Sequence, residues 1–280
     1  MTSAAPAQAN SETLPGRSSE DPRIDRLSAI LKVEQFRSSV QSAQRRDHRF
    51  FFIMAILAIT TVFVGYFPTY FQKPLESVIP LVPSPGLATI IHIHAAVMTV
   101  YFVFYVLQTA LVSVNRKALH MTLGWASVVL IPTIVILGTL VVFYGAELGH
   151  KGIWPDPEVA ALVFVLDVYV FAALACTAIL LRAKPEAHKR LMLLAIIAGL
   201  LPPALARSPL IHLGPFAVAA AVFAFLLAGP VYDLVNQRGI HPAYLWGLLF
   251  VVASMPPTRL ALGHTTAWHH FVDWAIVTVN

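Results

Sequence analysis

The sequence predicts an all-α integral membrane protein with seven membrane-crossing helices, and two observations carry that prediction. The 280-residue chain is 58% hydrophobic and only 12% charged, whereas a soluble domain is about half apolar and about a quarter charged. Seven apolar stretches follow one another from Phe51 onward, and a bilayer core about 30 Å thick needs about 20 apolar residues per helix. The expected spans are residues 50–71, 88–113, 122–146, 159–181, 190–206, 214–234 and 243–262.

Two segments precede the seven-helix domain, which is expected over residues 46–263. Residues 1–20 are rich in Ala, Ser, Pro and Gln and have no apolar core, so we expect a disordered tail rather than a signal peptide. Residues 21–45 open with a capping Asp21 and a first-turn Pro22, and apolar residues then share one face among basic ones. This pattern predicts an amphipathic helix that rests on an anionic leaflet or docks on the chain's own loops.

Two of the spans and the C-terminal segment have particular features. The fifth span is short and carries Pro202 and Pro203, so we expect it to bend or to end early. The second span is long, which predicts a tilted helix or one that extends past the headgroups. Residues 264–280 are amphipathic and aromatic, and are expected to lie along the outer membrane face.

The basic residues predict the orientation of the chain. If the N-terminus is inside, 15 of the 19 Lys and Arg residues lie on the cytoplasmic side, and only Lys73, Lys151, Arg207 and Arg259 lie outside. The positive-inside rule therefore predicts an N-in, C-out topology. The same distribution accounts for the net charge of +5 without nucleic acid, so the partner that it indicates is the lipid bilayer.

His92 and His94 are candidate ligands because they lie inside the second span among Ile and Ala. Residues two apart on a helix point about 200° away from each other, so only one of them can face the centre of the bundle. Ionisable groups at such depth are costly enough to be functional candidates. A neutral imidazole can ligate a metal ion or haem iron, or relay protons.

Four further polar residues are candidates for a site. Asp167 lies about nine residues into the fourth span, where an unpaired carboxylate costs about 2.5–3.5 kcal/mol. We expect it to pair with His94, Arg207 or Arg259. Gln108 is expected to bridge helices by hydrogen bonds. Arg207 and Arg259 flank helix ends near prolines, where they either snorkel to the interface or bind an anion.

On the inner side, His120 and His188 lie at the starts of the third and fifth spans. Two imidazoles that face one iron from opposite sides can bind haem, so this pair is a second candidate cofactor site. Haem b is the cofactor considered. The position of both residues at helix starts, rather than within helices, counts against this interpretation.

Several motifs resemble a widespread family of uncharacterised bacterial multi-pass membrane proteins, known only as a domain of unknown function. They are His92-Ile-His-Ala95, Gln108-x-x-Leu111-Val112, Leu119-His120-x-x-Leu123-Gly124, Pro185-Glu-Ala-His188-Lys-Arg-Leu-Met192 with Arg207 after it, and Arg259-Leu-Ala-Leu-Gly263. The resemblance covers about Arg45 to Trp274 and implies a location in the bacterial inner membrane. The segments around His120 and His188 also look similar to a larger superfamily suspected of haem binding. Tyr101 replaces a usual Trp, a departure that concerns packing.

Three functions stay open at this point: a haem or metal redox protein, a proton-coupled transporter, and a scaffold that assembles other membrane-protein subunits. Whether the chain is an enzyme is open too, since it carries no nucleophile elbow, Walker loop or HExxH zinc motif. A retinal-type photoreceptor is excluded, because it needs a buried lysine and every lysine lies in a tail or loop. Cys176, the single cysteine, is expected to be a buried apolar thiol.

Overall fold

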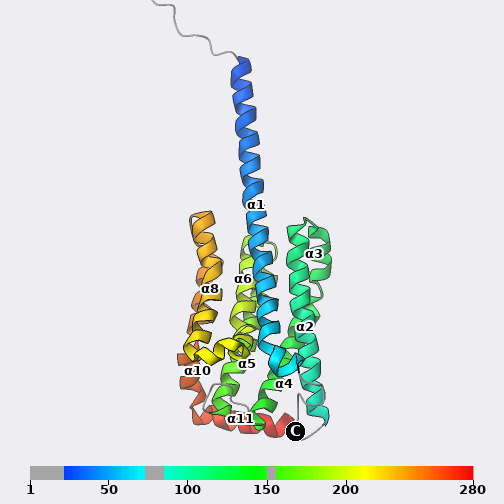
Figure 1. Cartoon of the computed structure of the whole chain (residues 1–280), viewed down its shortest axis with the longest axis vertical. Helices are drawn as coiled ribbons and strands as arrows, with labels where there is room; N and C mark the ends of the chain where they lie inside the picture. Colours follow the sequence, from blue (N-terminus) through cyan, green and yellow to red (C-terminus); the bar gives the residue numbers. More distant parts are fainter. Residues whose placement is uncertain (1–21, 73–84, 150–155, 280) are drawn as a thin grey trace, which may run out of the picture. The chain divides into compact units, whose positions relative to one another are not determined.

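The structure, a computed structural model, describes residues 22–72, 85–149 and 156–279 and is helical almost throughout (Figure 1). Its elements are α1 (Pro22–Tyr66), a π-helical turn (Phe67–Phe71), α2 (Pro85–Ser113), α3 (Lys117–Gly124), α4 (Ser127–Glu147), α5 (Pro157–Leu180), α6 (Pro185–Gly199), α7 (Pro202–Arg207), a 3-10 turn (Pro209–Leu213), α8 (Pro215–Gln237), α9 (Pro242–Ala253), α10 (Pro256–Gly263) and α11 (Thr266–Val279). The described residues contain no β-strand, which confirms the predicted all-α class.

Seven helical segments in the described part of the chain are long and apolar enough to cross a membrane, as predicted. They lie at Arg26–Tyr66, Thr89–Ser113, Ser127–Glu147, Pro157–Leu180, Pro185–Arg207, Pro215–Gln237 and Pro242–Gly263. The chain is therefore a multi-pass membrane protein by helix length and composition.

Prolines mark where most of these helices begin. α5, α6, α8 and α9 each have a proline as their first residue, a position where its missing N–H costs nothing because that group has no partner within the helix. Asp156 caps α5 by accepting a hydrogen bond from the Glu158 backbone N–H at 2.8 Å. The boundaries of the spans are thus set locally by the sequence.

Two of the seven spans are interrupted. In the fifth, α6 ends at Gly199 and α7 begins at Pro202, so this span is interrupted at the paired prolines where it was predicted to bend or to end early. In the seventh, α9 ends at Ala253 and α10 begins at Pro256, a break that was not predicted. Each break frees backbone carbonyl groups that need other partners inside a membrane.

α5 and α6 form the centre of the bundle, and α5 packs against both α4 and α6. Two thirds or more of the most apolar 18-residue window is buried in each of these two spans, at 67% and 72%, against 28% or less in the other five. Small residues allow the close approach. A Cβ on Gly199 would lie 2.5 Å from Cβ of Phe171 and 2.7 Å from the backbone oxygen of Asp167.

The chain divides into two units within α1, after Gln44. The first unit contains the expected tail, residues 1–20, which lies outside the described residues, and the segment 21–45 expected to form an amphipathic helix. That segment is helical from Pro22, where α1 begins. Leu27, Ile30 and Leu31 are all more than half exposed, so an apolar stripe is open along it.

In the second unit, α11 covers the C-terminal segment and packs against α4, α5 and α10. Figure 1 draws α11 (red) across the ends of the bundle helices, while α3 lies at the opposite end. Val272 of α11 packs with Phe143 of α4 and Ala161 of α5 in a small apolar cluster. We refer below to the two ends of the bundle as the α3 end and the α11 end.

Candidate functional site

Two histidines that are far apart in the sequence meet at the α3 end. His120 lies in α3 and His188 in the first turns of α6, and their ring centroids are 6.3 Å apart with the ring planes at 80°. Nδ1 of His188 donates a hydrogen bond to the backbone oxygen of Ala178 at 2.8 Å. Because a carbonyl oxygen can only accept, Nδ1 carries a hydrogen, and the lone pair of the neutral tautomer of His188 is then on Nε2.

Gln108, buried in α2, contacts His120 with both its backbone and its side chain. The Gln108 backbone oxygen lies 3.3 Å from Nδ1 of His120. In the amide orientation that satisfies both side-chain atoms, the nitrogen donates to the same Nδ1 at 2.5 Å and the oxygen accepts from the Gly124 N–H at 3.2 Å. The bond to the Gln108 backbone oxygen needs a hydrogen on Nδ1 of His120. The bond from the Gln108 side-chain nitrogen needs a lone pair on the same Nδ1, so Gln108 can hold His120 in either tautomer.

His120 lies between two spans and is partly buried. Burial lowers the pKa of its imidazole; the hydrogen bond to the Gln108 backbone oxygen raises it, and the nearby His188 lowers it further. The ring is therefore neutral at pH 7, the form in which imidazole binds a metal ion or haem iron. Three residues predicted from the sequence thus come together: Gln108, His120 and His188.

Beside this pair, the α3 end holds a buried ion pair between α6 and α8. Nε and Nη2 of Arg190 donate to Oδ2 and Oδ1 of Asp233 at 2.8 and 2.7 Å, and both side chains are fully buried. Nη1 of Arg190 bonds Oε2 of Glu186 at 2.6 Å, and Nη2 also bonds Oε1 of Gln237 at 2.8 Å. The His241 backbone N–H donates to Asp233 at 3.1 Å. With its donors engaged, Arg190 fixes the packing of α6 against α8.

The network continues to α1 through Lys189. Its ammonium group bonds Asp47 in α1 and Glu186 one turn away in α6. Lys189 also lies over the ring of Phe51, 5.4 Å from its centroid. The charged residues of this network therefore neutralise one another across α1, α6 and α8, which indicates a structural role.

At the α11 end, Asp167 pairs with Arg259, one of its three predicted partners. Nη1 of Arg259 donates to Oδ1 of Asp167 at 2.5 Å and to the backbone oxygen of Val163 at 2.8 Å, and both charged side chains are buried. Nε of Arg259 donates to the backbone oxygen of Ser254, which lies in the break between α9 and α10. Arg259 therefore binds both the Ser254 carbonyl group that this break leaves free and Asp167, the carboxylate in the middle of α5.

His92 and His94 lie apart, as expected for residues two positions apart on α2. Nδ1 of His92 lies 2.9 Å from the hydroxyl of Tyr70. His94 instead faces α4, where a Cβ added to Gly138 would lie 3.8 Å from its Cε1. Nδ1 of His94 is buried and has no hydrogen-bond partner among the described residues. No contact joins the two rings within the described part of the chain, so they do not form a shared ligand site.

Arg207 is separate from both sites. Its side chain is exposed, its Nη1 donates to the backbone oxygen of Pro203 at 3.0 Å, and its guanidinium lies 5.2 Å from the ring centroid of Tyr66. A bond to its own helix end and a contact with an aromatic ring explain its position without a ligand. Cys176 is exposed on α5 rather than buried, which corrects the expectation of a buried thiol.

Among residues 22–72, 85–149 and 156–279, no group of three or more His, Cys, Asp or Glu residues could hold a metal ion. A centre with three or four protein ligands, as in structural zinc sites, therefore has no ligand set there. The pair of His120 and His188 suits a centre that takes only two ligands from the protein.

Sequence reasoning did not single out Arg190 and Asp233 as a pair. Asp233, like Asp167, is a carboxylate inside an apolar span. This pattern in the sequence is enough to indicate Asp233 as a candidate. Arg190 was counted only among the basic residues at the inner ends of helices. Its burial depends on α8 packing against α6, which local sequence does not reveal.

The chain was compared with known proteins in three ways. No family model matches it, no curated protein matches it, and no solved structure matches it.

Proposed function

We propose that this chain is a membrane redox protein that binds haem b through His120 and His188 and takes part in electron transfer. The observation that carries the proposal is the 6.3 Å separation of the two ring centroids. Two imidazoles that ligate one iron from opposite sides have centroids roughly 6 Å apart, because each metal–nitrogen bond is about 2 Å long.

The hydrogen bonds of the pair support the same function. Nδ1 of His188 donates to Ala178 O, and Nδ1 of His120 can donate to the backbone oxygen of Gln108. Such bonds orient a ligating imidazole and leave Nε2 free for the metal. Haem bound there would supply one-electron chemistry, and His120 and His188 would be the two residues that hold its iron.

The residues around the pair would position it rather than react. Gln108 would position the ring of His120 through its contacts with Nδ1. The ion pair of Arg190 with Asp233 would hold the start of α6, and so His188, in place. Partial burial keeps His120 neutral and able to ligate.

We further propose an N-in, C-out topology in a bacterial inner membrane, so that the α3 end faces the cytoplasm. The support is the 15 basic residues that this orientation leaves inside. The proposed membership of the uncharacterised multi-pass family is supported by the motifs quoted above. Three residues of these motifs, Gln108, His120 and His188, lie at one site.

The two other functions have less support. Proton-coupled transport needs a carboxylate that can exchange its proton, but Asp167 is held by Arg259 and makes no hydrogen bond or ion pair with His94. A scaffold for other membrane subunits would use the exposed apolar faces, which any membrane protein presents to lipid.

Absorption spectroscopy of the detergent-purified chain, produced in haem-supplied cells, tests the proposal. We expect a Soret band, a sharpened band on reduction, and about one haem per chain. The variants His120→Ala and His188→Ala should each lose the bound haem. The variant His212→Ala should retain it, because His212 is an exposed residue of the 3-10 turn. A wild-type protein with neither haem nor bound metal would overturn the proposal.

A further inference from the structure

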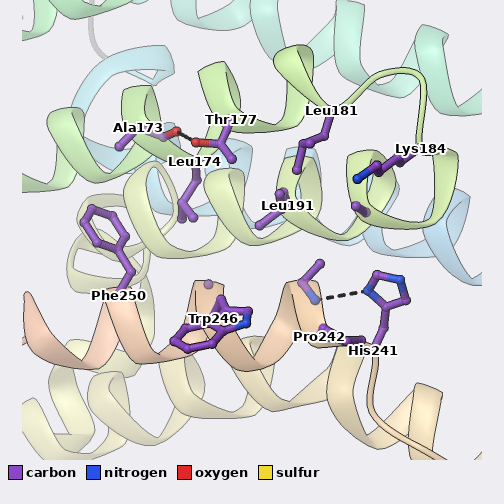
Figure 2. A pocket seen from close by; sticks show the side chains of 13 residues that line it. Ala173, Leu174, Thr177, Leu181, Lys184, Leu191, His241, Pro242, Trp246 and Phe250 are labelled. Atoms are coloured by element: carbon purple, nitrogen blue, oxygen red, sulfur yellow. Dashed lines mark hydrogen bonds between the residues drawn. The ribbon is translucent and has the colours of Figure 1, made fainter.

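A groove of about 470 Å³ runs between α5, α6 and α9 (Figure 2). Leu174, Leu181 and Leu191 line one wall, and Trp246 and Phe250 line the wall formed by α9. Small residues such as Ala173 and Gly247 leave the space between them. Its volume is within the range of about 300–1,000 Å³ that is typical of small-molecule sites.

The groove has cationic and hydrogen-bonding groups at one end only. Lys184, in the turn before α6, and His241, the cap of α9, lie at the same end of the groove in Figure 2. The ammonium of Lys184 makes no hydrogen bond or ion pair with the described residues. Nδ1 of His241 accepts from the Ala243 N–H at 3.1 Å, so its hydrogen lies on Nε2, which is left to donate.

His241 acts there as a neutral donor. Burial lowers the pKa of its imidazole, and the nearby charge of Arg190 lowers it further, although Asp233 and Glu186 oppose this. The formal positive charge at this end of the groove is therefore that of Lys184, with the imidazole N–H beside it.

The surroundings of the groove decide what occupies it. All three helices belong to segments long and apolar enough to span a membrane, so the medium at this surface is lipid. An open apolar groove in contact with lipid is filled by acyl chain, because an empty space forfeits dispersion contacts. A cation at the headgroup end of an acyl-chain groove attracts an anionic phosphate.

We infer that the groove binds one anionic phospholipid, with an acyl chain between α5, α6 and α9 and the phosphate at Lys184 and His241. Trp246 lies along the acyl chain, and the lipid comes from the leaflet that borders the α3 end. The site is separate from the His120–His188 pair, so the inference does not depend on haem binding.

Native mass spectrometry of the full chain tests headgroup selection. The probes are palmitoyl-oleoyl phosphatidylglycerol and phosphatidylcholine, which have the same acyl chains and differ in charge. We expect the wild type to retain phosphatidylglycerol in preference, and Lys184→Gln to weaken that retention about fivefold, the effect of one lysine near an anionic lipid. Arg116→Gln removes an exposed charge outside the groove and should leave the preference unchanged.

A quenching experiment locates the acyl chain. Phosphatidylglycerol with a brominated chain should quench the fluorescence of the wild type more than that of Trp246→Phe, and Ala173→Phe, which fills the groove, should reduce lipid retention. Equal retention of the two lipids by the wild type, equal losses in Lys184→Gln and Arg116→Gln, or quenching that does not depend on Trp246 would each overturn the inference. Lipid-free dimers as the main species would assign the groove to a second copy instead.

Discussion

Arg190 and Asp233 form an ion pair with two hydrogen bonds, 2.8 and 2.7 Å long, and neither side chain has any exposed surface. The pair joins α6, in the centre of the bundle, to α8. The guanidinium of Arg190 also donates hydrogen bonds to the side chains of Glu186 and Gln237. A fully buried charge pair of this kind is costly to break because each partner is left without compensation.

Removing one partner should destabilise the protein strongly. Asp233→Asn and Arg190→Gln are each expected to lower the free energy of unfolding by about 3–5 kcal/mol. Thermal unfolding of the purified protein in detergent, followed by circular dichroism, measures the effect. Lys117→Gln, which removes an exposed charge at the start of α3, serves as the control and should unfold like the wild type.

Replacing both partners together should cost less than replacing either one. The double variant Arg190→Met/Asp233→Leu leaves no buried charge on the pair, so it is expected to be more stable than both single variants. If the double variant loses as much as the sum of two independent changes, the two side chains are not coupled and the structural role assigned to the pair is wrong.

The ion pair of Arg259 with Asp167 at the α11 end predicts that lysine at position 259 makes the protein less stable than arginine does. Arg259→Lys keeps the charge, but one ammonium group lacks the planar fork that reaches Asp167, Val163 and Ser254 together. We expect a loss of about 1–3 kcal/mol, the cost of leaving a buried acceptor unsatisfied, in a urea or thermal unfolding series. Arg207→Lys, at an exposed site, is the matched control and should have little effect.

Close packing of α5 on α6 predicts that Gly199 tolerates no side chain. The Cβ of Gly199→Ala would lie 2.5 Å from Cβ of Phe171, so the two helices must separate, at a cost of about 1–3 kcal/mol. Gly124→Ala in α3 meets nothing within 4 Å and should be neutral or stabilising by up to about 1 kcal/mol. Equal melting temperatures for the two variants would contradict the packing described.

The lowered pKa of His120 predicts a loss of stability in mild acid. The ordinary imidazole pKa is 6.5, so below about this pH the unfolded chain binds a proton that the folded chain resists. Stability therefore falls as the pH decreases through this window. Melting temperatures measured from pH 7.5 to pH 5 should decrease less steeply in His120→Gln than in the wild type. His264→Gln, at an exposed residue, should keep the wild-type slope.

The proposed orientation predicts opposite accessibility at the two ends of the chain. In a Cys176→Ser background, which removes the only native cysteine, Thr265→Cys should react with a membrane-impermeant maleimide in whole cells with a permeabilised outer membrane. Lys117→Cys should react only after the inner membrane is disrupted. Labelling in the reverse pattern would show that the N-terminus is outside.

The helices could be predicted because their signals are local. Apolar runs of about 20 residues mark the spans, and prolines at residues such as Pro157, Pro185 and Pro242 mark the starts. The paired prolines at 202 and 203 predicted the interruption of the fifth span. The break of the seventh span at Ser254–Met255 carried the same signal in Pro256 and Pro257, which was overlooked.

The candidate site was predicted only in part. Residue type and depth singled out Asp167, but three partners were equally compatible with the sequence, and only the position of α10 against α5 brings Arg259 to it. The proposed pairing of His120 with His188 required α3 to lie against the start of α6. Arg190 and Asp233 were not paired at all.

Residues that are neighbours along the chain are enough to establish that it is helical, that seven segments can cross a bilayer, and where most of these segments begin. The contacts of His94 with α4, of Asp167 with Arg259 and of Arg190 with Asp233 depend instead on how the helices pack. Lipid makes every apolar face of a helix equivalent, so the sequence of one helix does not specify which neighbour its few polar groups will reach.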